Sequence, residues 1–162
     1  MEINNLKFGL DTFGDTQQDD AGNPISAAQT IRNVVDQAVL ADELGLDFFS
    51  IGEHHRDDFA ISSPDTVLAG IATRTKKIIL GTGVTVLSSD DPVRVYQRFA
   101  TLDALSNGRA EITAGRGSFI ESFPLFGYEL KDYGVLFEEK LELLSKFSKN
   151  MQLHGLGRLE RH

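Results

Sequence analysis

Cysteine is missing altogether from this sequence of 162 residues. Disulfide bonds, thiolate metal sites and a thiol nucleophile are therefore excluded. Long apolar runs are missing too, since none approaches the ~18 residues that are needed to span a bilayer. Residues 1–5 contain neither the basic patch nor the apolar segment of a secretory signal. These absences predict a cytoplasmic protein without a membrane partner.

Positive charge is scarce as well. The chain has 16 Lys and Arg against 24 Asp and Glu, which gives a formal net charge of −8. Nucleic acid and anionic membrane surfaces would be repelled, so neither is expected as a partner. With 41% hydrophobic residues the chain is able to bury a core and is most simply one domain.

Strand-like and helix-like patterns alternate along the chain. Strands are expected at residues 6–11, 48–51, 78–87 and 110–114. Helices with one apolar face are expected from residues 26, 64 and 92 onward, and again after residue 132. This alternation predicts an α/β fold with a parallel sheet and right-handed crossovers, either a doubly wound sheet or a barrel.

The four units fill about half of an eight-unit (β/α)8 barrel. After residue 150 the pattern changes, and residues 151–162 match neither a fifth strand nor a helix. The expected organisation is therefore a half-barrel at residues 1–150 followed by a tail.

The strand at residues 48–51 ends in Glu53-His54-His55. Barrel enzymes place their chemistry at the carboxyl ends of the strands. Successive residues of an extended chain point to opposite faces, so only one of the two histidines aims inward. Adjacent histidines do not chelate one ion easily and no His-Glu-x-x-His spacing is present, so no metal site is expected. The segment indicates an imidazole acid or base beside a cofactor, or else a structural, hydrogen-bonded histidine.

Two glycines lie within the strand expected at residues 78–87. Gly81 and Gly83 do not form a dinucleotide fingerprint, because a strand and not a helix continues from Val84. They indicate a backbone that a flat group approaches closely, or a simple bulge.

The segment Gly115-Arg116-Gly117 follows the fourth strand. Its guanidinium group offers five donors, which suit an anion or the carbonyl edge of a planar heterocycle. A salt bridge from Arg116 to Glu53 or Glu121 is the alternative.

Together these segments resemble the luciferase-like monooxygenase family, the flavin-dependent barrel enzymes that include bacterial luciferase. The resemblance covers residues 4–148, and residues 151–162 fall outside it. It rests on Glu53-His54-His55, residues 80–94, residues 102–109 and Gly115-Arg116-Gly117, which occur in this order. It implies a TIM-type barrel of which this chain is the N-terminal half.

The resemblance also implies a cofactor and a site. The cofactor is reduced FMN, supplied by a reductase or by NAD(P)H, which acts with O2 on a small organic substrate. His54 is implied as the acid or base, and Gly83 and Val84 as the backbone step beneath the flavin ring, often a non-prolyl cis peptide. The remaining implied flavin contacts are Glu53, His55, Gly115, Arg116 and Phe119.

Two other functions stay open. In the first, the chain is a non-catalytic flavin-binding protein or an inactive remnant. In the second, it is a relative that uses a deazaflavin. In all three cases a half-barrel leaves the edges of its first and fourth strands unpaired and exposes an apolar interior face. A homodimer or a higher homo-oligomer is therefore expected.

Overall fold

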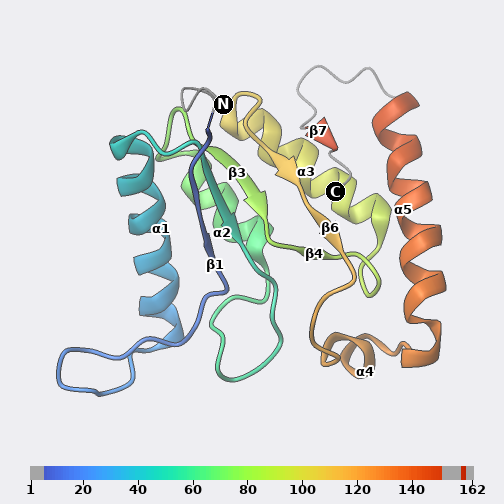
Figure 1. The fold of residues 1–162 in the computed structure, drawn as a ribbon, viewed down its shortest axis with the longest axis horizontal. Coiled ribbons are helices and arrows are strands. Elements are labelled where there is room, and N and C mark those ends of the chain that lie inside the picture. The colour runs from blue at the N-terminus through green and yellow to red at the C-terminus, as the bar shows by residue number, and fades with distance from the viewer. Residues whose placement is uncertain (1–5, 151–157, 160–162) are drawn as a thin grey trace.

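A computed structural model of the protein describes residues 6–150 and 158–159 (Figure 1). Its strands are β1 (Gly9–Thr12), β2 (Phe48–Ile51), β3 (Ile79–Thr82), β4 (Thr85–Val86), β5 (Glu111–Ile112), β6 (Ala114–Gly115) and β7 (Arg158–Leu159). Its helices are α1 (Ala27–Leu44), α2 (Pro64–Ala72), α3 (Pro92–Ser106), α4 (Ser122–Phe126) and α5 (Tyr133–Asn150), with a 3-10 turn η2 (Leu130–Asp132) before α5.

The strands are parallel and follow one another in chain order. Gly9 of β1 pairs with Phe48 of β2, which pairs with Ile79 of β3. The third unit continues as β4, which pairs with β6 of the fourth unit. In the fourth unit β5 lies beside β3 through a bridge between Leu80 and Ala110, and β7 pairs with β5. A doubly wound sheet would reverse its strand order, and this one does not. The fold is therefore a set of parallel βα units of the TIM-barrel type, as predicted, in the form of a half-barrel.

Helices α1, α2, α3 and α5 cover one face of the strands (Figure 1). Capping residues close to the helix ends determine where α1 and α3 begin or end. The side chain of Ser26 accepts a hydrogen bond from Gln29 N, and α1 ends at Gly45 with a φ of 81°. The Asp91 carboxylate caps α3 by accepting from Val93 N and Arg94 N. None of the helices among the described residues combines the length and the apolarity that crossing a bilayer requires.

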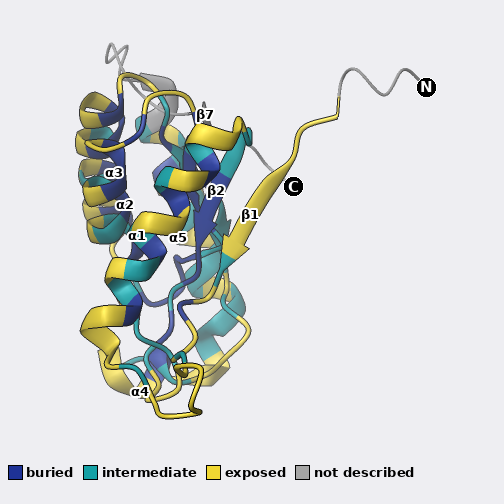
Figure 2. Cartoon of the chain, turned by 90° about the vertical axis from the view of Figure 1, so that its left-hand side faces the viewer, coloured by how far each residue is buried: buried dark blue, intermediate teal, exposed yellow. Residues whose placement is uncertain are grey.

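The core lies between the strands and these helices. Phe49, Ile51 and Leu80 point toward the helices and are fully buried. They pack with apolar side chains of the helices, among them Leu68, Ile71, Val95 and Leu102. Figure 2 shows the contrast with β1, which is exposed along most of its length at the side of the molecule away from α2 and α3.

Four segments differ from the prediction. The strand expected at residues 78–87 is divided into β3 and β4, and the one expected at 110–114 into β5 and β6. The loop expected at 118–132 contains α4 and η2, and residues 158–159 form a short strand where none was expected. The strands in these segments pair with residues from elsewhere in the chain, so the local pattern does not reveal their bounds. The expectation that residues 151–162 lie outside the family remains a prediction, and most of them lie outside the described residues.

Candidate functional site

The carboxyl ends of β1, β2 and β3 build the floor of the candidate site. Their register places Asp11, Ser50 and Gly81 side by side, and Ser50 Oγ donates a hydrogen bond to Asp11 Oδ1. Gly83 lies directly over this pair. A Cβ atom added to Gly83 would lie 2.7 Å from Asp11 Oδ1 and 3.0 Å from Ser50 Oγ. The contact leaves room for glycine only, unless Asp11 moves.

The peptide bond between Gly83 and Val84 is cis, as the resemblance implied. Gly115 of β6 packs against this step, since a Cβ atom added there would lie 2.5 Å from Val84 Cγ2. Three of the predicted site residues thus lie together, namely Gly83, Val84 and Gly115.

His54 lies in an aromatic enclosure. It is only 8% exposed. Its ring stacks on Phe59 with 4.1 Å between the ring centroids, and the edges of Phe13 and Phe119 meet it at 5.5 Å and 5.2 Å. These rings come from the segments after β1, β2 and β6, and they shield the imidazole from water.

The two nitrogens of His54 face different surroundings. A Cβ atom added to Gly52 would lie 3.4 Å from His54 Nε2 and 3.4 Å from the carbonyl oxygen of Gly83. Nε2 and the Gly83 carbonyl oxygen therefore both lie next to Gly52. Nδ1 lies 3.8 Å from Glu121 Oε1, which is too far for a direct hydrogen bond.

Glu53 and His55 occupy the other side of the same segment. His55 Nε2 lies 3.0 Å from Glu53 Oε1, and Val86 N donates to Glu53 Oε2 at 3.2 Å. Glu53 thereby ties β4 to the end of β2. Glu53 and His55 contact each other, whereas His54 contacts three phenylalanine rings, which fits the alternation expected for this segment.

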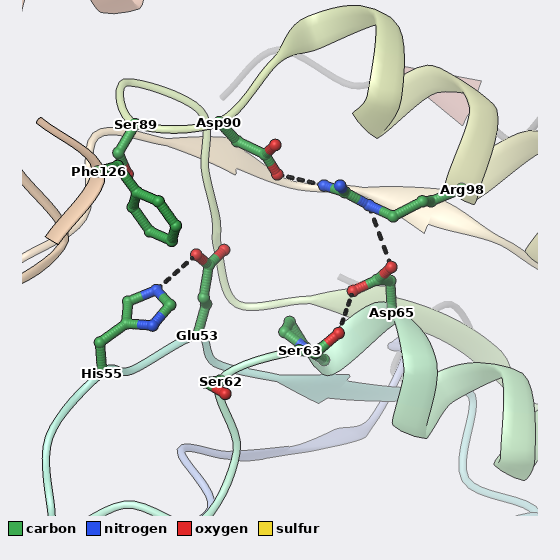
Figure 3. A pocket seen from close by; sticks show the side chains of 10 residues that line it. Glu53, His55, Ser62, Ser63, Asp65, Ser89, Asp90, Arg98 and Phe126 are labelled. Carbon is green, nitrogen blue, oxygen red and sulfur yellow. Dashed lines mark hydrogen bonds and ion pairs between the residues drawn. The ribbon is translucent and has the colours of Figure 1, made fainter.

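Glu53 and His55 line a pocket of about 250 Å³ at the N-terminal ends of α2 and α3 (Figure 3). On its far wall Arg98 forms ion pairs with two carboxylates, Asp65 at 3.0 Å and Asp90. The acidic side chains of this pocket are thus paired with Arg98 and His55, which accounts for them as structural ion pairs.

Arg116 and Phe119 lie apart from each other. The Arg116 guanidinium stands over the rings of Tyr133 and Phe137 on α5, with its Cζ 5.4 Å and 5.9 Å from their centroids. Phe119 contacts His54, and Arg56 Cζ stands 4.8 Å over its outer face. The structure therefore brings Phe119 to the histidine, whereas it places Arg116 against α5.

Arg56 is held in turn by an exposed ion pair, with its Nη2 2.8 Å from Asp58 Oδ2. The hydrogen bond from Arg56 lowers the pKa of the Asp58 carboxyl below its usual value. This pair orders the loop at residues 56–58. Within residues 6–150 and 158–159 there is no group of three or more His, Asp and Glu residues placed to hold a metal ion.

Sequence reasoning missed several residues of the site. Asp11 was noted only as part of a strand, although an ionisable residue at a strand end is a signal for a barrel site. Phe13 and Phe59 lie in loops, where no periodic pattern marks them, and Glu121 is predicted only as an alternative ion-pair partner of Arg116. Only their contacts with His54 reveal them.

Comparisons with known proteins give a consistent result. The family model for luciferase-like monooxygenases matches residues 7–158. The N-acetyl-S-alkylcysteine monooxygenase of Bacillus subtilis is 34% identical over 132 residues, which are 80% of this chain and 40% of that protein. The crystal structure of the monooxygenase RslO1 from Streptomyces bottropensis matches 97% of this chain and 47% of its own, with a TM-score of 0.78 and 28% identity.

A further structure shares the fold at 22% identity and a TM-score of 0.78, over 95% of this chain and 42% of its own. It is the oxygenating constituent of 3,6-diketocamphane monooxygenase from Pseudomonas putida, in complex with FMN. This chain thus spans less than half the length of the relatives that it matches. Since the family model covers nearly all of the sequence, the chain belongs to the luciferase-like monooxygenase family.

Proposed function

We propose that this chain contributes to a flavin-dependent monooxygenase, which uses reduced FMN and O2 to oxidise a small organic substrate. The observation that supports this most is the backbone step at Gly83–Val84, where Val84 packs against Gly115 and Gly83 lies, like the buried His54, next to Gly52. Glycine backbone lets a flat ring approach closely, because no Cβ atom keeps it away. When bound, reduced FMN supplies the electrons that activate O2.

The chain's own residues have distinct parts in this proposal. His54 holds or moves a proton at Nε2, which lies next to Gly52, as the Gly83 carbonyl oxygen does. Phe13, Phe59 and Phe119 exclude water around the imidazole, which strengthens its polar interactions. Glu53 and His55 hold the end of β4 in place.

Arg116 belongs to the proposed flavin site on the strength of its position directly after Gly115. Its contacts with Tyr133 and Phe137 restrict the guanidinium to the outer rim of the strand ends. From there it is suited to the polar edge or the phosphate side of the cofactor.

FMN is expected to bind the 162-residue chain weakly, with a dissociation constant in the micromolar range or above. By the resemblance, the phosphate-binding residues of the family lie largely in the second half of the barrel. Each missing charged hydrogen bond costs about 1.5–3 kcal/mol, and about 1.4 kcal/mol is tenfold in affinity. Arg116→Ala should weaken binding about fivefold further. Quenching of flavin fluorescence measures both values.

Arg94→Ala is the matched control, because Arg94 lies exposed on α3 and donates to Gln97. Equal affinity of Arg116→Ala and the parent chain would remove Arg116 from the site. Binding of a deazaflavin in place of FMN would favour the deazaflavin alternative. FMN binding without aldehyde-dependent O2 uptake would favour the non-catalytic one.

A homodimer or a higher homo-oligomer is part of the proposal. In the described part of the chain β1 pairs with β2 alone, so its other edge is open. Leu6, Phe8 and Leu10 are exposed along it, Phe8 to 62%. An open edge with apolar side chains pairs readily with a second copy.

Light scattering of the 162-residue chain is therefore expected to report at least twice its mass of 17.8 kDa. Leu10→Lys should shift the protein toward monomer, because a charge at an open edge opposes pairing. Leu44→Lys, at the exposed end of α1, is the matched control and should leave the mass unchanged. A folded monomer of the parent chain at micromolar concentration would contradict the proposal.

The proposal also covers the substrate class, the excluded partners and the location of the protein. The substrate class is an aldehyde, an alkane or a sulfonate-like molecule, as the family resemblance implies. The net charge of −8 supports the absence of nucleic acid and anionic membranes among the partners. The proposed location is the cytoplasm, where NAD(P)H is available to reduce flavin.

A further inference from the structure

A small cavity lies behind His54. It measures about 10 Å³ and is bounded by residues that include Glu53, His54, Glu121 and Ser122. A space of this size accommodates about one water molecule. For a water to stay there, it needs two to four polar partners.

Two polar atoms of the lining are suited to this role. His54 is 8% exposed and Ser122 is 3% exposed. Within the described part of the chain, neither His54 Nδ1 nor Ser122 Oγ has a hydrogen-bond partner. Buried polar groups are almost always paired, with protein or with an ordered water, because leaving them unpaired is costly.

A carboxylate completes the set. Glu121 Oε1 lies 3.8 Å from His54 Nδ1, too far for a direct hydrogen bond and suited to a bridge through one water. The cavity's other carboxylate, Glu53, already accepts from Val86 N and pairs with His55. Glu121 is therefore the acceptor that is placed for the water.

We propose that one buried water joins His54 Nδ1, Ser122 Oγ and Glu121 Oε1, and that Glu121 and Ser122 position His54. The water accepts from Nδ1–H and donates to Glu121. The proton is thereby held on Nδ1, and Nε2 keeps its lone pair. The catalytic use of this tautomer rests on the proposed function, whereas the water bridge itself does not.

The tautomer is directly measurable. At about pH 8, where an ordinary imidazole is neutral, long-range 1H–15N spectra of protein labelled at histidine distinguish the Nδ1–H and Nε2–H forms. Free imidazole side chains favour Nε2–H, so a predominant Nδ1–H form of His54 is the expected result. The spectrum of His54→Asn assigns the signals. This readout needs neither flavin nor substrate.

Glu121→Met keeps the length of the side chain and removes the acceptor. It is expected to lower the ratio of Nδ1–H to Nε2–H about fivefold, as for the loss of one ordinary hydrogen bond. Ser122→Ala should lower it in the same direction. Glu129→Met is the matched control, since Glu129 is exposed in the next turn and pairs with Lys131.

A predominant Nε2–H form in the parent chain would overturn the proposal. An unchanged ratio in Glu121→Met or in Ser122→Ala would remove that residue from the bridge. Failure of FMN to bind would contradict the proposed function and leave the bridge standing, so the two failures are distinguishable.

Discussion

Arg109→Ala is expected to lower the free energy of unfolding by about 3–5 kcal/mol. The Arg109 guanidinium donates five hydrogen bonds at the amino ends of the strands, far from the candidate site. Its acceptors are the carbonyl oxygens of Ala72, Thr75, Ile78 and Ser106 and the hydroxyl of Thr75. Removing it leaves several of these groups without a partner, and each such loss is costly where water is excluded.

The pKa of Arg109 is lowered by burial, which the charge of Asp42 partly offsets. A half-buried guanidinium whose five donors are all used indicates a structural role for Arg109. Urea unfolding followed by circular dichroism measures the effect. Arg109→Lys keeps the charge but loses the planar set of five donors, so an intermediate decrease in the free energy of unfolding is expected. Arg94→Ala should change stability by less than about 0.5 kcal/mol. A loss of that small size in Arg109→Ala would contradict the structural role.

His54→Gln is expected to lower substrate oxidation by about 10²- to 10⁴-fold, the usual contribution of a general acid or base. Glutamine fills much of the aromatic enclosure and cannot exchange a proton near neutral pH. O2 uptake with reduced FMN and an aliphatic aldehyde measures the rate. Circular dichroism checks that the fold is kept.

His55→Gln is the matched comparison for this prediction. His55 pairs with Glu53 on the opposite side of the segment, so its loss should reduce the rate much less. Full activity in His54→Gln together with loss in His55→Gln would show that the two histidines have the opposite roles.

Much of the fold could be predicted because its signals are local. Ser26 and Asp91 cap their helices with their own side chains, and Gly45 ends α1 in the left-handed region. The division of the third strand could not be predicted. It occurs at Gly83, whose close neighbours Asp11 and Ser50 come from two other strands.

The candidate site divides in the same way. Glu53-His54-His55 and the glycines stand at strand ends, which is a pattern that a sequence displays. The enclosure of His54 by Phe13 and Phe59 and its cavity with Glu121 depend on loop geometry. The direction of the Arg116 side chain depends on Tyr133 and Phe137, which belong to a helix further along the chain.

The chain-order pairing of the strands has a consequence for how the protein acquires its fold. Each of β1, β2 and β3 finds its partner in the adjacent βα unit, as Gly9 does with Phe48 and Phe48 with Ile79. Each pairing therefore closes a loop of only one βα unit, which keeps its entropic cost small. None of the pairings among these three strands requires a more distant segment. Such a chain is able to grow its sheet strand by strand as it leaves the ribosome. The outer edge of β1 is the one edge of these three strands that no later strand of the described units pairs with.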